Sequence, residues 1–214
     1  MEHKFDCTII KTMDGAAVEY GYLFGNEQII FIKVGADEEI RKSCNRVMRY
    51  AELAARAHRV YGATVICASN PDIPHEELDE QAIRWVASQQ GYRQFSLSLW
   101  GISDGAYQNL KLAKRMAETQ AFIGVNPSFV TVTDFKHKLQ ALPDVKKFLI
   151  YGTKDDDLNV VAPALREWQN QQLKILFIDG ADHGFADHPL PILHSIDLLY
   201  DDCGFHRFCC ATAK

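Results

Sequence analysis

Short runs of apolar residues alternate with amphipathic stretches along almost the whole chain. Near-continuous apolar runs are typical of buried parallel strands, and apolar residues at intervals of three or four positions are typical of helices. The runs that predict strands cover residues 29–34, 63–68, 95–100, 121–125, 147–151 and 173–178. The stretches that predict helices cover 37–59, 75–90, a segment that starts near residue 106, and 191–200. Strands that alternate with helices predict a parallel sheet covered by helices on both faces.

Two segments at the start of the chain differ from this pattern. Residues 5–11 and 17–24 each alternate between apolar and polar positions, and a turn sequence at 13–15 separates them. Such alternation around a glycine-containing turn predicts an antiparallel hairpin. The expected fold is therefore α/β, a doubly wound and mostly parallel sheet with an antiparallel N-terminal hairpin. Sheets of this kind bind ligands beyond the carboxyl ends of their strands, so the residues that follow each strand are the candidates for chemistry.

Composition adds an expectation about domains and metals. The 214 residues are 47% hydrophobic and 24% charged, which is ordinary for a globular protein, and residues 1–214 are expected to form one domain. The six cysteines lack the Cys-x-x-Cys spacing of a zinc site, and this includes Cys203, Cys209 and Cys210 in the tail 201–214. The sequence predicts no metal and no cofactor, and the cysteine-rich tail has no assigned role.

Charge and hydropathy argue against several partners. The net charge is −5, and lysine and arginine are not clustered, which argues against nucleic acid or an anionic membrane. No apolar run approaches the roughly 20 residues that cross a bilayer, and no secretory signal is apparent at the N-terminus. Cysteines without a disulfide or metal pattern fit a reducing compartment, so the expected location is cytoplasmic. The sequence does not indicate an oligomeric state.

One motif lies at a strand end. Gly101-Ile102-Ser103-Asp104-Gly105 joins the strand at 95–100 to the helix that starts near residue 106, which is the arrangement of a nucleophile elbow. A serine at the apex of such a turn adopts strained backbone angles. The flanking positions require glycine because the strand and the helix leave no space for side chains there. The first N–H groups of the helix point at the serine, where an oxyanion would form.

Two other strand ends carry groups that activate a serine. Asp155 follows the fifth apolar run and His183 follows the sixth. Histidine removes a proton near neutral pH, and a carboxylate holds its tautomer and stabilises its charged form. Asp156 and Asp157 are alternatives to Asp155. His188 is the alternative to His183, although it precedes a proline and looks like the entry to the last helix.

These features resemble the α/β-hydrolase superfamily, over nearly the whole chain from residue 5 to about residue 200. The matching pieces are the initial hairpin, the elbow, the turn Gly152-Thr153-Lys154-Asp155 and the loop Gly180-Ala181-Asp182-His183-Gly184-Phe185. Their order is the family's order of nucleophile, acid and histidine. The resemblance implies that Ser103 is the nucleophile, His183 the general base and Asp155 the orienting acid. It also implies an oxyanion hole formed by the backbone N–H groups of Asp104 and Ala36.

The chain departs from the family pattern at this oxyanion hole. Many members carry a His-Gly pair where this chain reads Lys33-Val34-Gly35-Ala36-Asp37. An aspartate at position 104 is also unusual for an esterase. Its carboxylate would oppose a developing oxyanion unless it points away or pairs with a cation, and helix capping is a further role for it.

The activity that the resemblance implies is hydrolysis of a carboxylic ester or thioester through an acyl-enzyme, on a small-molecule or acylated substrate. An acyltransferase or an amidase would use the same triad, and a non-catalytic binding protein could keep the fold. The connection between residues 125 and 147 is too short for a substantial cap, which predicts an open site. Phe129 and Trp100 are candidates for an acyl pocket or for the core. The acids expected at the mouth, which would disfavour anionic substrates, are Asp37, Asp104, Asp155, Asp156 and Asp182.

Overall fold

The computed structural model describes residues 6–11, 17–35, 48–70, 76–142, 144–168 and 172–200. Within these ranges, eight strands form one sheet in the order β1-β2-β4-β3-β5-β6-β7-β8. The pairs β1–β2 and β2–β4 are antiparallel, and the other neighbours are parallel. The strands are β1 (Asp6–Lys11), β2 (Ala17–Leu23), β3 (Asn26–Lys33), β4 (Ala63–Ala68), β5 (Ser96–Ile102), β6 (Thr119–Val125), β7 (Lys146–Gly152) and β8 (Leu173–Ile178). This confirms the mostly parallel sheet with an antiparallel N-terminal hairpin.

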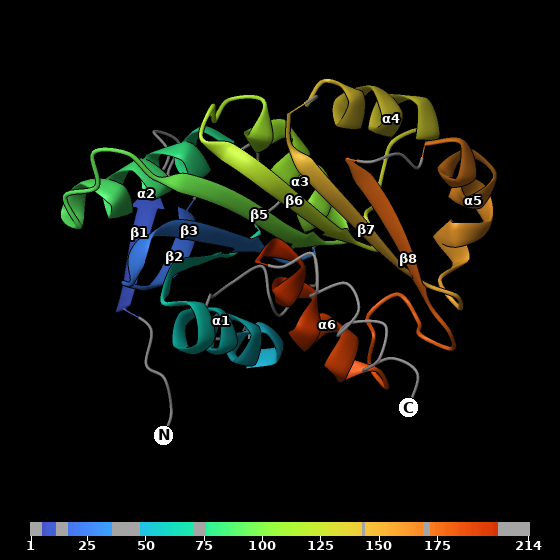
Figure 1. The fold of residues 1–214 in the computed structure, drawn as a ribbon, viewed down its shortest axis with the longest axis horizontal. Coiled ribbons are helices and arrows are strands. Elements are labelled where there is room, and N and C mark those ends of the chain that lie inside the picture. The colour runs from blue at the N-terminus through green and yellow to red at the C-terminus, as the bar shows by residue number, and fades with distance from the viewer. Residues whose placement is uncertain are drawn as a thin grey trace.

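Helices cover both faces of the sheet (Figure 1). The helices are α1 (Met48–Tyr61), α2 (Glu76–Gln89), α3 (Asp104–Ala113), α4 (Val132–Gln140), α5 (Asp156–Trp168) and α6 (Pro189–Ser195), which continues as a 3₁₀ turn (Ile196–Leu199). Of these described helices, α1 and α6 pack on one face of the sheet and the other four pack on the opposite face. Each face has its own apolar core. Because both faces are buried, the central strands are apolar at nearly every position, which is why their sequences do not alternate.

The nucleophile strand shows how the two cores divide its side chains. Leu97 and Leu99 belong to the core under α2–α5, and Trp100 belongs to the core under α1 and α6. The Trp100 side chain is fully buried, and its Nε1 donates to Ser195 Oγ at 2.8 Å. Trp100 is therefore a core residue. Phe129 is half-buried and packs against the opposite core.

Several predicted boundaries differ from the structure. The described part of the helix expected from residue 37 begins at Met48, because residues 36–47 lie outside the described ranges. α5 begins at Asp156, directly after the acid turn, rather than near Val160 as the sequence pattern predicts. The connection between β6 and β7 contains α4, a helix of 9 residues, and no other helix or strand among its described residues. The described residues between β6 and β7 therefore form no substantial lid. None of the described helices is long and apolar enough to cross a bilayer.

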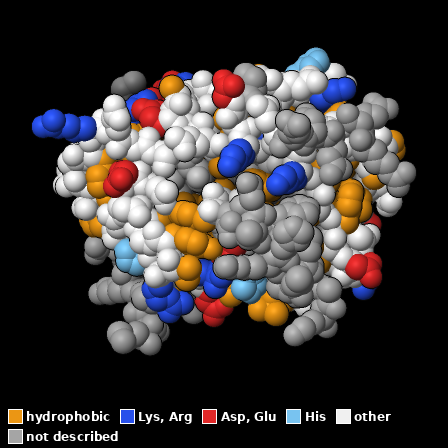
Figure 2. Space-filling view, in the orientation of Figure 1, with side chains coloured by type: hydrophobic (Ala, Val, Ile, Leu, Met, Phe, Trp, Pro, Cys, Tyr) orange, Lys and Arg blue, Asp and Glu red, His pale blue; other side chains and the backbone are white. Residues whose placement is uncertain are grey.

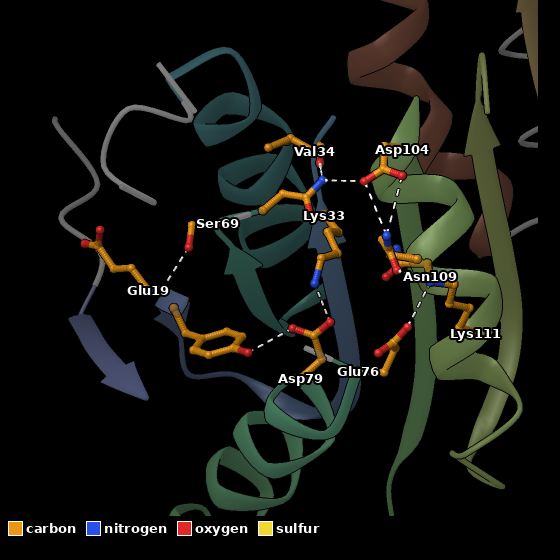
Figure 3. Close-up of polar contacts among 12 residues, drawn as sticks. Glu19, Lys33, Val34, Ser69, Glu76, Asp79, Asp104, Asn109 and Lys111 are labelled. Carbon is orange, nitrogen blue, oxygen red and sulfur yellow. Dashed lines mark hydrogen bonds and ion pairs between the residues drawn. The ribbon is translucent and has the colours of Figure 1, made fainter. Parts of the chain in front are cut away.

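The end of β3 contains a buried lysine, Lys33, which the sequence pattern includes only as part of the segment around an apolar strand. Lys33 is fully buried and pairs with Asp79 of α2, which is also fully buried. The Tyr20 hydroxyl donates to the other oxygen of Asp79 at 2.8 Å, and Figure 3 shows both contacts converging on this carboxylate. Burial lowers the pKa of Lys33, while Asp79 acts in the opposite direction. The pair joins the end of β3 to α2.

We expect the substitution Asp79→Leu to destabilise the protein by about 3–5 kcal/mol, because it leaves the Lys33 amine buried without its carboxylate. The triple variant Tyr20→Phe/Lys33→Met/Asp79→Leu should recover most of this loss, since it removes the ion pair together with the hydroxyl that donates to Asp79. Glu80→Ala, which breaks more exposed ion pairs with Arg84 and Arg115, is the control and should cost less than about 1 kcal/mol per pair. Urea unfolding measures all three, and an Asp79→Leu loss no larger than that of Glu80→Ala would contradict the expectation.

Candidate active site

Ser103 occupies the turn between β5 and α3 in a strained conformation. Its φ is 55° and its ψ is −130°, in a region that non-glycine residues rarely adopt. A side-chain carbon on Gly101 would lie 2.6 Å from the Ala106 backbone, and one on Gly105 would lie 2.4 Å from the Lys33 carbonyl oxygen. Both glycines are thus required by close backbone approach, for the reason expected of the motif.

The structure brings together the three residues that the sequence singled out. His183 Nε2 lies 2.9 Å from Ser103 Oγ, and His183 Nδ1 lies 3.0 Å from Asp155 Oδ2. Asp155 is 3% exposed, so its carboxylate is shielded from water. Among the alternatives, His188 is the N-cap of α6, and Asp156 and Asp157 lie in the first turn of α5. Asp157 has a carboxylate oxygen within 4.8 Å of His183, but the hydrogen bond to Nδ1 comes from Asp155.

The Asp155 carboxylate raises the pKa of the imidazole. Its hydrogen bond with His183 is the main cause that raises the pKa of His183, while burial acts in the opposite direction. A proton on Nδ1 shared with this carboxylate leaves Nε2 of the neutral ring as an acceptor for the Ser103 hydroxyl. The Asp157 N–H donates to the second oxygen of Asp155 at 3.0 Å, which fixes the carboxylate plane. The arrangement can therefore remove a proton from Ser103 and hold the resulting positive charge.

Two residues at this edge were not singled out by the sequence. Ser128 Oγ lies 3.0 Å from Ser103 Oγ, and the Ser128 N–H donates to the Ser103 carbonyl at 3.1 Å. Asn126, the first residue after β6, hydrogen-bonds to the loop that carries His183 and to the first residue of the acid turn. Both residues follow a predicted strand end, which is the one sequence signal that could have found them.

Asp104 is held by amide groups. Its carboxylate accepts from Asn70 Nδ2 at 3.1 Å and from Gln108 Nε2 at 3.5 Å, and Asn70 Nδ2 also donates to the Val34 carbonyl at 2.9 Å. Figure 3 shows this bridge between the end of β3 and the start of α3. The second residue expected at the oxyanion hole, Ala36, lies outside the described ranges. Gly35 is described, and a side-chain carbon there would lie 2.9 Å from Ser103 Cβ.

One group of residues in the described part of the chain has the spacing of metal ligands. Asp155, Asp157 and His183 each place one ligand atom within 4.8 Å of the others. Asp155 and His183 are already hydrogen-bonded to each other, so a metal ion would have to displace the contact that orients the imidazole. The arrangement suits proton transfer better than metal binding.

A cavity of about 370 Å³ lies beside the histidine loop, between α1 and α6. Its buried residues are Tyr50, Leu53, Phe185 and Ile192, and Glu52 is the charged residue among those that line it. On the face seen in Figure 2, the described lysine and arginine side chains are dispersed rather than gathered into one patch. The cavity thus has both apolar and polar lining, and it borders Gly184, the residue after His183.

Comparison with known proteins identifies the fold. No protein-family model matches the sequence, and no curated protein sequence matches it. A structure from Agrobacterium tumefaciens, described as a protein of unknown function and a candidate α/β hydrolase, matches with a TM-score of 0.69 and 18% identity over 91% of this chain and 94% of that one. A serine hydrolase without a lid from Xanthomonas campestris matches with a TM-score of 0.63 and 19% identity, over 96% and 95%. The S-formylglutathione hydrolase of Staphylococcus aureus matches with a TM-score of 0.66 and 12% identity, over 92% and 99%. The protein has the α/β-hydrolase fold.

We expect His183 to titrate above 6.5, the ordinary value for histidine, because Asp155 stabilises its charged form. Asp155→Asn removes this cause, so the pKa should fall and more of the ring should be neutral at pH 7. Asp157→Asn is the control: Asp157 contributes less to this pKa than Asp155 does, so the shift should be smaller. The imidazole signals in an NMR pH titration measure each value, and equal shifts in the two variants would contradict the assignment.

Proposed function

We propose that the protein is a serine hydrolase that cleaves a carboxylic ester or thioester through an acyl-enzyme. The observation that carries this proposal is the chain of contacts from Ser103 Oγ to His183 Nε2 and from His183 Nδ1 to buried Asp155. The matched structures described as a serine hydrolase without a lid and as an S-formylglutathione hydrolase support the same class of reaction.

The geometry allows the following sequence of steps. His183 Nε2 takes the proton of the Ser103 hydroxyl while Oγ forms a bond to the substrate's carbonyl carbon. The carbonyl oxygen becomes an oxyanion, for which the proposed donors are the backbone N–H groups of Asp104 and Ala36. Collapse of this intermediate breaks the bond to the leaving group, which receives the proton from His183. Water then attacks the acyl-enzyme with His183 again as the base and releases the acid.

The strained serine favours catalysis over a binding role. A non-glycine residue at φ 55° costs on the order of 1–3 kcal/mol, and a binding protein gains nothing from placing Oγ against an imidazole. An acyltransferase or an amidase would use the same groups with a different acceptor or leaving group. The product formed after acylation distinguishes an acyltransferase from an esterase. The leaving group released during acylation, an amine rather than an alcohol or thiol, distinguishes an amidase.

We expect a fluorophosphonate probe to form an adduct on Ser103, because His183 activates this hydroxyl. Ser103→Ala should lose the adduct completely, and His183→Ala should slow it by at least about 10²-fold. Peptide mass analysis locates the adduct.

Two exposed residues provide matched controls for this labelling experiment. Ser88→Ala and His137→Ala alter the same residue types at exposed positions of α2 and α4 and should label like the unmodified protein. If the folded protein carries no adduct on Ser103, the catalytic proposal is wrong and the binding-protein alternative takes its place.

The cavity beside the histidine loop is our candidate site for the acyl group; Gly184, next to His183, is one of its lining residues. Its volume, about 370 Å³, lies within the range of pockets that take small molecules. Glu52 at the lining and the exposed acid Asp182 next to His183 would repel a carboxylate-bearing chain. We therefore propose that an uncharged acyl chain binds in this cavity between α1 and α6.

We expect Leu193→Trp, which adds bulk to the lining of this cavity, to reduce hydrolysis of an octanoyl ester by on the order of tenfold more than that of an acetyl ester. Leu190→Trp adds the same bulk on the same helix at a position that is 54% exposed. It should leave the ratio of the octanoyl ester rate to the acetyl ester rate unchanged. Initial rates with p-nitrophenyl esters measure it. An unchanged chain-length preference in Leu193→Trp would place the acyl chain elsewhere.

A further inference from the structure

Asn126 adopts a strained conformation at the same edge as the proposed triad. Among the described residues, three that are not glycine have a positive φ: Ser103, Asn126 and Phe185. The first is the proposed nucleophile and the last lies in the loop that carries His183. Asn126 itself has a φ of 38° and is 1% exposed. Asparagine tolerates this region better than most residues, but the conformation still needs support from its surroundings.

The Asn126 side chain provides that support through three hydrogen bonds to two loops. Its Nδ2 donates to the His183 carbonyl at 2.9 Å and to the Asp182 carbonyl at 3.1 Å. Its Oδ1 accepts from the Gly152 N–H at 2.9 Å. Both amide hydrogens and the amide oxygen are therefore used, which is what a buried amide requires.

These bonds hold the backbone near both proposed catalytic side chains from one fixed point, the end of β6. Gly152 begins the turn that ends at Asp155, and its own N–H is held by Asn126. The loops of Asp155 and His183 also contact each other directly, since the Lys154 N–H donates to the Ala181 carbonyl at 2.9 Å. Asn126 adds a bond at the carbonyl of His183 itself. It thus restrains the backbone from which the imidazole projects.

We propose that Asn126 is a positioning residue that sets His183 against Asp155 by holding both loops to the end of β6. The inference rests on the proposed serine hydrolase function, although the geometry it concerns is measurable without activity. An amide is required at this position because it presents two donors to two carbonyl oxygens and one acceptor to an N–H. An aspartate would keep the acceptor and place an oxygen against both carbonyls.

Two substitutions separate the contribution of the hydrogen bonds from that of the strained backbone. Asn126→Asp keeps the size and the acceptor but loses both donors. Asn126→Gly removes the side chain and accepts a positive φ without strain, so it remains informative if the first variant does not fold. Both should lower the rate of Ser103 phosphonylation by about 10- to 100-fold, as expected when a reacting group is displaced slightly. The KM for an ester substrate should change little.

Asn109 provides the matched control. It is a fully buried asparagine on α3 whose Nδ2 donates to the Trp100 carbonyl at 2.9 Å. Asn109→Asp should lower the unfolding midpoint as a lost buried donor does, without changing the pKa of His183. In Asn126→Gly, the pKa of His183 should fall toward its ordinary value because the contact with Asp155 loosens, and NMR titration measures this directly.

The outcomes distinguish the inference from the function on which it rests. Slower labelling together with a lower His183 pKa in Asn126→Gly supports the positioning role. If both remain as in the unmodified protein, or if Asn109→Asp changes them equally, the positioning role is wrong. If the unmodified protein does not label but the His183 pKa still falls in Asn126→Gly, the positioning geometry stands and the proposed function does not.

Discussion

The arrangement of the site depends on backbone contact between three segments at Ser103. A side-chain carbon on Gly105 would lie 2.4 Å from the Lys33 carbonyl oxygen, and one on Gly35 would lie 2.9 Å from Ser103 Cβ. The end of β3, the turn after β5 and the start of α3 can meet only because glycine occupies these positions. This contact fixes where Oγ projects, and the residues after β6, β7 and β8 are placed relative to it by neighbouring positions in one sheet.

The sheet then acts as a rigid frame that brings distant residues together. β5, β6, β7 and β8 are consecutive neighbours, so the residues that follow them line one edge. Ser103, Asn126, Asp155 and His183 each follow a different one of these strands. Hydrogen bonds from the end of one strand to the ends of others add to this frame: Asn126, after β6, binds Gly152 of β7 and the loop after β8. Groups held on such a frame reach a reactive geometry without a large entropic cost when substrate binds.

Much of this arrangement could be predicted from the sequence, because its signals are local. The glycines around Ser103 and the positions of Asp155 and His183 after apolar runs need only a few neighbouring residues to be recognised. Lys33 and Asn126 were not recognised because their roles depend on partners far along the chain. In the sequence, Lys33 lies within an apolar strand, and its partner Asp79 comes from α2, 46 residues later. Nothing near Asn126 in the sequence reveals that its amide faces two carbonyls from the loop after β8.

Asp104 shows how an apparent conflict in the sequence is resolved by the fold. A carboxylate beside a proposed oxyanion donor is electrostatically unfavourable, yet this one accepts hydrogen bonds from Asn70 and Gln108, and hydrogen bonds to a charged group are worth about 1.5–3 kcal/mol. Asn70 also binds the Val34 carbonyl, so the same carboxylate ties the start of α3 to the backbone that leads to the second proposed donor. At position 104, a neutral residue without a hydrogen-bond acceptor would remove the repulsion of the oxyanion. It would also remove the hydrogen bond to Asn70. We infer that fixed donor spacing outweighs the repulsion here, because an oxyanion site stabilises charge only when its donors are held in place before the reaction.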